Sequence, residues 1–226
     1  MNKTFSGEFV FQLFALLIAF IAVQAAYTTV VRPNATAILA EQRAQMKADP
    51  NYTPQQSWYV ILKDYEQQAE IVLGIWALAI MVYKARRLSR ERAMLDRELV
   101  PLAEGMRVLP EDTREYLRQV EALPQAERGL LLPRALQNAL QRFGATRNVQ
   151  DASSSTNTLI MAEGERLESE LSMIRYILWA IPSIGFIGTV RGIGDALSQA
   201  NRAVTGDISG VTESLGVAFN STLIAL

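Results

Sequence analysis

The chain has 226 residues, of which 50% are hydrophobic and 20% are charged, and it contains no Cys and no His. Without these two residue types it lacks disulfides, thiol nucleophiles, Cys metal sites and the commonest catalytic base, so no enzyme, cofactor or resident metal is expected. The 22 Lys and Arg nearly balance the 23 Asp and Glu, and no nucleic-acid partner is predicted.

The first apolar segment, Phe9–Val31, has 23 consecutive residues without a charge. As a helix it is long enough to cross a hydrocarbon core of about 30 Å. The alternative is a signal peptide, with Lys3 as its basic region and a loose cleavage site at Val23-Gln24-Ala25. Because the run is longer than such a peptide needs, we predict an N-terminal tail and first span over 1–31, followed by an outer segment over 32–68.

Three further apolar segments follow. Their uncharged parts are Ile71–Tyr83, Tyr176–Val190 and a stretch that begins at Ser214 and is still apolar at Leu226. The first two are short for a span, but their flanks lengthen them, so we predict a second span over 69–88 and a hairpin of spans three and four over 173–226. The expected fold is an all-α membrane protein with four transmembrane helices, the fourth truncated at the chain end and continuing in a longer protein.

The distribution of basic residues indicates how the chain is oriented in the membrane. Four Lys and Arg occur between Arg32 and Glu70, whereas fifteen occur between Lys84 and Arg175. Loops rich in Lys and Arg stay in the cytoplasm, so the second connection, 89–172, and the N-terminus are predicted to be cytoplasmic.

Helix formers dominate this cytoplasmic segment. We predict helices over Leu88–Val100, Pro110–Leu123 and Leu132–Phe143, the last ending at Gly144. Ser153, Ser154 and Ser155 then offer N-caps for one long helix that runs from the cytoplasm into span three.

Span three carries small residues on one face. They recur at spacings of three or four and comprise Gly185, Gly188, Thr189, Gly192 and Ala196. Small residues let helix backbones approach closely in a membrane, and Pro182 in the same span frees a backbone carbonyl near Leu178. Tight packing around a kink, with no further role, is the alternative interpretation of this face.

Span four carries three adjacent polar residues, Asn220, Ser221 and Thr222. They cover too much of the helix circumference to face one neighbour, and hydroxyls that line a dehydrated path can replace the hydration shell of an ion. The alternative is a bond from each hydroxyl back to its own helix. Thr189 and Thr222 form the natural pair of an ion pathway, because each lies deep in its span of one hairpin.

Charged residues are sparse in the spans. No Asp, Glu or Lys is expected in any span core, and Arg191 and Asp195, four residues apart, are expected to pair. If this protein conducts ions, another subunit then has to supply the carboxylate that carriers of protons or cations use.

Two stretches resemble the MotA/TolQ/ExbB proton-channel family. They are AIPSIGFIGTVRGI, residues 180–193, and GVTESLGVAFNSTLIAL, residues 210–226. The four-span layout with a large segment between spans two and three is similar to the flagellar stator arrangement in that family. Thr189, Thr222 and Pro182 match family positions, whereas Glu213 is nine residues before Thr222, where some members have a Glu five before, so that role is not transferred.

The resemblance implies an ion-driven motor subunit of the bacterial inner membrane. Family members form homo-oligomers, typically pentamers, around a single-span ExbD/TolR/MotB-like partner with a transmembrane Asp, and they work in contact with membrane lipid. The resemblance is compatible with either H⁺ or Na⁺ as the transported ion. A non-conducting membrane scaffold or signalling subunit is the alternative function.

Overall fold

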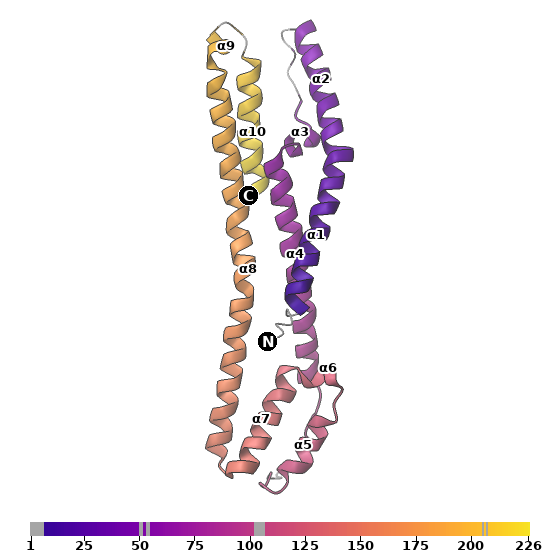
Figure 1. Cartoon of the computed structure of the whole chain (residues 1–226), viewed down its shortest axis with the longest axis vertical. Helices are drawn as coiled ribbons and strands as arrows, with labels where there is room; N and C mark the ends of the chain where they lie inside the picture. The colour runs from indigo at the N-terminus through magenta and orange to yellow at the C-terminus, as the bar shows by residue number, and fades with distance from the viewer. Residues whose placement is uncertain (1–6, 50–51, 53–54, 102–106, 205, 207) are drawn as a thin grey trace, which may run out of the picture. The chain divides into compact units, whose positions relative to one another are not determined.

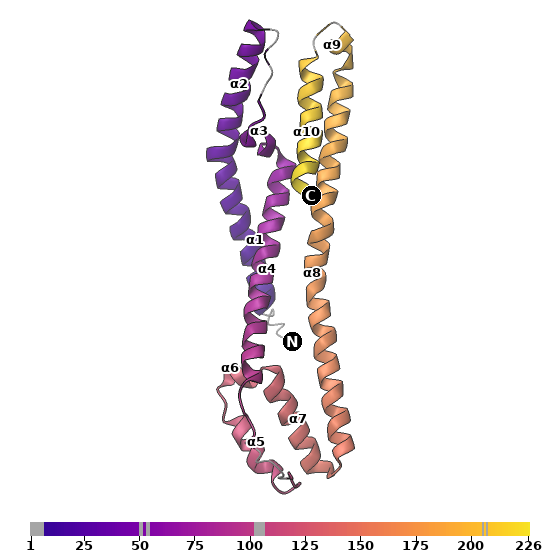
Figure 2. The ribbon, with the colours of Figure 1, turned by 180° about the vertical axis from the view of Figure 1, so that it is seen from behind.

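A computed structural model of the chain describes residues 7–49, 52, 55–101, 107–204, 206 and 208–226. Every regular element among these residues is a helix (Figures 1 and 2), which confirms the predicted all-α class. Lys3, the basic residue of the signal-peptide alternative, lies outside the described residues.

The helical elements follow one another in chain order. They are α1 Gly7–Ala26, the π-helical turn η1 Tyr27–Val31, α2 Arg32–Ala48, α3 Trp58–Leu62, α4 Tyr65–Leu95, α5 Thr113–Glu121, α6 Gln125–Arg128, α7 Leu131–Thr146, α8 Val149–Ser198, α9 Ala200–Val204 and α10 Ser209–Ala225.

The chain divides into two compact units. We call Met1–Met81 together with Met173–Leu226 the span unit, and Val82–Ser172 the middle unit. Both α4 and α8 have residues in each unit. The predicted segment boundaries at 31, 68, 88 and 172 stay predictions.

Among the described residues, three helical runs are long and apolar enough to cross a membrane: Gly7–Met46, Tyr65–Leu95 and Val149–Ser198. Helix α10 has 17 residues and is not among them. At 1.5 Å per residue it extends about 26 Å, slightly less than a hydrocarbon core of about 30 Å. The fourth span therefore stays a prediction.

In the span unit, α4 packs against α1 on one side and against α8 on the other (Figures 1 and 2). Two buried apolar clusters make these contacts: Val23, Tyr27 and Val72 between α1, η1 and α4, and Ala77, Ile80 and Ile177 between α4 and α8. The indole Nε1 of Trp76 on α4 also donates a hydrogen bond to the carbonyl oxygen of Gln12 on α1, at 2.9 Å.

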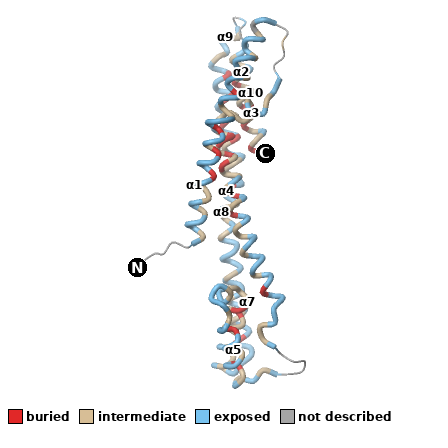
Figure 3. The backbone as a smooth tube through the Cα atoms, turned by 90° about the vertical axis from the view of Figure 1, so that its right-hand side faces the viewer, coloured by how far each residue is buried: buried red, intermediate tan, exposed pale blue. Residues whose placement is uncertain are grey.

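Much of the apolar surface of α1 is uncovered. Phe14, Leu17, Ile18 and Ile21 are all more than half exposed, and Figure 3 shows few buried positions along this helix. Soluble monomers rarely expose apolar surface of this extent, so this face suits contact with lipid or with other helices.

The π-helical turn η1 joins α1 to α2 without a break. Within it the hydroxyl of Thr29 donates to a carbonyl oxygen one turn earlier, at 2.8 Å. Arg32 follows directly and reaches α4: its Nη2 donates to Oε1 of Gln68 at 2.6 Å, and its guanidinium lies 4.3 Å from the centroid of the Tyr65 ring. The turn thus directs a cation onto the start of α4.

In the middle unit, α5 packs against α7. The prediction that the helix ends at Gly144 is wrong: α7 continues to Thr146 and ends where Arg147 adopts a left-handed φ of 56°. The reason is packing, because a Cβ on Gly144 would lie 2.6 Å from Oγ1 of Thr113 on α5. Gly144 therefore permits a helix contact and does not end a helix.

The long helix that the sequence predicts is α8, with 50 residues. The predicted serine caps are wrong, because α8 begins at Val149 and the side chain of Asn148 accepts a hydrogen bond from the amide of Gln150 at 2.9 Å. Ser155 lies inside the helix and donates to Asn138 on α7 at 2.9 Å. The separate helix expected over Leu88–Val100 is also wrong, since those residues continue α4 as far as Leu95.

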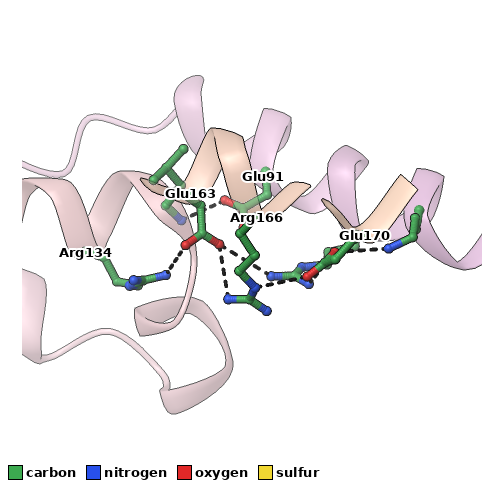
Figure 4. Close-up of polar contacts among 8 residues, drawn as sticks. Glu91, Arg134, Glu163, Arg166 and Glu170 are labelled. Atoms are coloured by element: carbon green, nitrogen blue, oxygen red, sulfur yellow. Dashed lines mark hydrogen bonds and ion pairs between the residues drawn. The ribbon is translucent and has the colours of Figure 1, made fainter. Parts of the chain in front are cut away.

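A network of ion pairs connects α4, α7 and α8 within the middle unit (Figure 4). Glu163 lies 3.1 Å from Arg134 and 3.4 Å from Arg166, and Glu170 lies 3.0 Å from Lys84 and 3.0 Å from Arg166. Burial alone would raise the pKa of the Glu170 carboxyl, but the hydrogen bond from Lys84 and the charges of Lys84, Arg166 and Arg87 outweigh it and hold this pKa below its usual value.

We therefore expect Glu170→Gln to lower stability at neutral pH and to have no effect in acid. Because folding depresses the pKa of Glu170, its ionised form stabilises the folded state above the unfolded pKa, and this contribution disappears as the pH falls through the folded pKa. The loss at pH 7 should be about 1–2 kcal/mol. Thermal unfolding of the full chain in detergent, followed by circular dichroism from pH 7 into progressively stronger acid, measures it. A difference between variant and wild type that does not shrink as the pH falls would contradict it.

Candidate functional site

Helix α8 and helix α10 approach each other along the glycines of α8. A Cβ on Gly192 would lie 2.7 Å from the backbone nitrogen of Ala218 and 2.7 Å from the carbonyl oxygen of Ser214. A Cβ on Gly188 would overlap the side chain of Ser221, and one on Gly185 would lie 3.1 Å from the Ser221 carbonyl oxygen. The three glycines thus let the backbones of α8 and α10 pack closely.

The structure brings Thr189 and Thr222 together at this contact. Their hydroxyl oxygens lie 2.5 Å apart, and Oγ1 of Thr189 is also 3.1 Å from the carbonyl oxygens of Gly185 and Ala218. Since Thr189 has one hydroxyl proton to donate, Thr222 can donate to Thr189 while Thr189 donates to a carbonyl. Both hydroxyls bridge two helices in this way.

The other two polar residues of α10 differ in their surroundings. Ser221 is fully buried, and its Oγ accepts a hydrogen bond from Nε2 of Gln67 on α4 at 3.3 Å. Asn220 is half-buried and takes no part in the hydrogen bonds that connect Ser221 and Thr222 to α4 and α8. The three adjacent side chains therefore do not share one neighbour.

Pro182 lies inside α8, which continues through it. It is exposed, whereas Gly185, three residues later, is buried. Pro182 therefore does not join the cluster that Thr189 and Thr222 form.

Helix α4 adds polar residues that the sequence pattern alone did not predict as part of the site. Gln67 and Glu70 are buried, with 0% and 3% exposure. A Cβ on Gly185 would lie 3.4 Å from Oε1 of Glu70, and one on Gly188 would lie 3.1 Å from Cγ of Glu66. Glu66, Gln67 and Glu70 thus line the same contact. Glu70 follows Glu66 by four residues and Gln67 by three, and this spacing is the signal that could have placed it on a face with both.

These contacts bear on two expectations about charge. Glu70, at the edge of the predicted second span, is buried beside Gly185, so a carboxyl group of this chain faces the uncharged part of α8. The expectation that no span core holds an Asp, Glu or Lys stays a prediction. Arg191 pairs with Glu66, its Nη2 lying 3.0 Å from Oε2, and not with Asp195. A helix-to-helix ion pair has replaced the expected pair within one helix.

Glu213, at the start of α10, takes part in a separate ion-pair group. It lies 2.7 Å from Arg43 on α2 and 4.0 Å from Lys63. Beside it, burial raises the pKa of Asp64 above its usual value, although the charge of Lys63 opposes this. These residues connect α2 and α10 and make no bond with the Thr189–Thr222 pair.

The arrangement offers hydroxyls, carbonyls and one buried carboxyl along three adjacent helices. Among the described residues, no three acidic side chains lie close enough to hold a metal ion. Ligands of this kind can coordinate a dehydrated cation or relay a proton.

Comparison with known protein families gives a match to the last part of the chain. The model of a family described as the MotA/TolQ/ExbB proton channel family matches residues 128–226, which confirms the resemblance drawn from residues 180–193 and 210–226. No curated protein and no solved structure matches the chain. The match covers less than half of the chain, and together with the three apolar helices it supports a multi-pass membrane protein.

Proposed function

Residues 128–226 belong to the MotA/TolQ/ExbB proton channel family, and from that premise we propose that this chain is the ring-forming subunit of an ion-driven channel or motor. It works in the bacterial inner membrane as a homo-oligomer, a pentamer by analogy with the family, around a single-span ExbD/TolR/MotB-like partner. The observation that carries this proposal is the bridge between the hydroxyls of Thr189 and Thr222, 2.5 Å apart, inside the matched region.

Ion flow in this proposal passes along the contact between α8 and α10. The partner's transmembrane Asp binds H⁺ or Na⁺ and, once neutral, can face apolar side chains. When ionised it is held beside the hydroxyls of Thr189 and Thr222 and nearby water, because a bare charge in the membrane is costly. Gly185, Gly188 and Gly192 keep α8 and α10 close enough for one hydroxyl pair to serve both helices.

The distribution of Lys and Arg supports the predicted orientation of the chain in the membrane. Fifteen Lys and Arg between Lys84 and Arg175, against four between Arg32 and Glu70, favour a cytoplasmic middle unit and N-terminus. The connection between α8 and α10 then faces outward.

Thr222→Val is expected to reduce partner-dependent ion flux at least tenfold without breaking the complex. Valine keeps the shape of threonine but removes the hydroxyl, and losing one such ligand costs about 1.4 kcal/mol, or a factor of ten. The measurement is flux in vesicles that hold the chain and a single-span, Asp-bearing partner, under separate proton and sodium gradients, which also identifies the ion.

Thr212→Val is the matched control. Thr212 is exposed near the start of α10, and its hydroxyl bonds back to Ile208 of its own helix turn at 3.1 Å. The Thr212→Val variant should therefore conduct ions as the wild type does. Normal flux in Thr222→Val would overturn the pathway, and an intact wild-type complex without flux in either gradient would favour the non-conducting scaffold.

A further inference from the structure

Glu70 on α4 is a buried acid without a partner. It is 3% exposed, and neither carboxyl oxygen has a hydrogen-bond partner among the described residues. Buried polar groups are nearly always paired, so this exception in the span unit calls for an explanation.

Glu70 lies beside a part of α8 that is far from the charged residues on either side. Oε1 of Glu70 lies 3.4 Å from the place of a Cβ on Gly185. Gly185 is six residues from Arg191 and ten from Arg175, which corresponds to about 9 Å and about 15 Å along α8. Glu70 is therefore well inside the uncharged part of α8, although the sequence alone marks it as the edge of an apolar segment.

The groups around Glu70 offer no positive charge. On α4, Glu66 lies one turn earlier and is already paired with Arg191 of α8. On the α1 side the titratable neighbour is the buried phenol of Tyr27. Helix α10 presents Ser221 and Ala225 beside Gly185, and both are uncharged. Among the described residues, no Lys or Arg forms an ion pair with Glu70.

An unpaired carboxylate at such a place costs far more free energy than a protonated, uncharged acid. The carboxyl group lies at ordinary contact distance from the Gly185 face, where the side chain of Ala225 from α10 also packs. Ser221, which meets the same glycine face, accepts a hydrogen bond from Gln67, one turn earlier on α4. An acid that is neutral when enclosed and ionised when water or another carboxyl approaches is a proton carrier.

We propose that Glu70 is a proton-binding residue of the ion pathway, so that this chain itself contributes a carboxyl group that gains and loses a proton inside the membrane. The inference rests on the proposed channel function. In the loading step an O–H bond of a hydronium ion or of the partner's carboxyl breaks, leaving water or a carboxylate, and the proton forms an O–H bond with the Glu70 carboxylate. In the release step that bond breaks, and the proton passes to water or to the next carboxylate.

Infrared spectroscopy of the full chain in lipid tests the protonated state directly. A protonated carboxyl has a carbonyl stretch above the amide I band, and D₂O shifts it. We expect this band at neutral pH in the wild type and in Glu66→Gln, and its loss in Glu70→Gln. A wild-type spectrum without the band, or a band that persists in Glu70→Gln, would overturn the proposal.

Flux measurements separate this inference from the proposed function. With the partner present, Glu70→Gln should conduct protons at least tenfold more slowly than the wild type, while Glu70→Asp, which keeps an acid, should retain part of the flux. If the wild type conducts and Glu70→Gln conducts equally well, Glu70 is not in the pathway, although the channel stands. If the wild type does not conduct, the proposed function itself fails.

Discussion

Gly192→Ala should destabilise the protein by about 2–3 kcal/mol, the cost of overpacking a tight contact. The added Cβ would lie 2.7 Å from two backbone atoms of α10, the Ala218 nitrogen and the Ser214 carbonyl oxygen. A side chain could rotate away, but a helix backbone cannot, so α8 and α10 have to separate. The contact between Thr189 and Thr222, formed across the same two helices, should weaken with it.

Gly194→Ala is the matched control, two residues further along α8. Nothing lies within 4 Å of a Cβ at Gly194, and replacing a helical glycine with alanine normally stabilises by roughly 0.5–1 kcal/mol. Replacing glycine with alanine should therefore lower the stability of the protein at position 192 and raise it at position 194. Thermal unfolding of both variants in detergent measures this, and a stabilising Gly192→Ala would refute the close approach of α8 and α10.

Arg191→Glu should be comparably damaging, with a loss of about 2–3 kcal/mol that a second change reverses. It places a carboxylate where the guanidinium lies 3.0 Å from Glu66, so an attraction becomes a repulsion, and the mostly buried Glu66 loses its partner. The exposure of Arg191, 42% for its side chain, keeps the loss below that of a fully buried pair.

The double variant Glu66→Arg with Arg191→Glu restores opposite charges across α4 and α8. We expect it to recover at least half of the lost stability, measured as the coupling energy in a double-mutant cycle. If the double variant is no more stable than Arg191→Glu, the ion pair does not hold α4 against α8.

The sequence was sufficient for the features that depend on local periodicity. Apolar runs without charges predicted the long helices, and spacings of three and four placed Gly185, Gly188 and Gly192 on one face. The family motifs identified the matched region, because they consist of residues close together in the chain. The roles of Thr189, Thr222, Ser221 and Asn220 stay predictions, as does the role of Pro182.

The features that the sequence did not predict depend on contacts between distant segments of the chain. A hydropathy reading ends a span at its first charged residue, so Glu70 marked a boundary until α8 and α10 were seen to enclose it. Arg191 met a carboxylate 125 residues away in the sequence, and no local spacing reveals such a partner. The helix ends were mispredicted for the same reason. A tertiary contact explains why α7 continues past Gly144. A cap by Asn148, in place of the serines, explains where α8 begins.

The π-helical turn η1 makes the count of residues between α1 and α2 as important as their identity. Each residue in an α-helix turns the chain by about 100°, so deleting one residue from Tyr27–Val31 would rotate every side chain of α2 by that angle relative to α1. Arg32 would then leave Gln68 and the Tyr65 ring, and Arg43 would leave Glu213. The register of α2 against the rest of the span unit is thus sensitive to insertions and deletions in this turn.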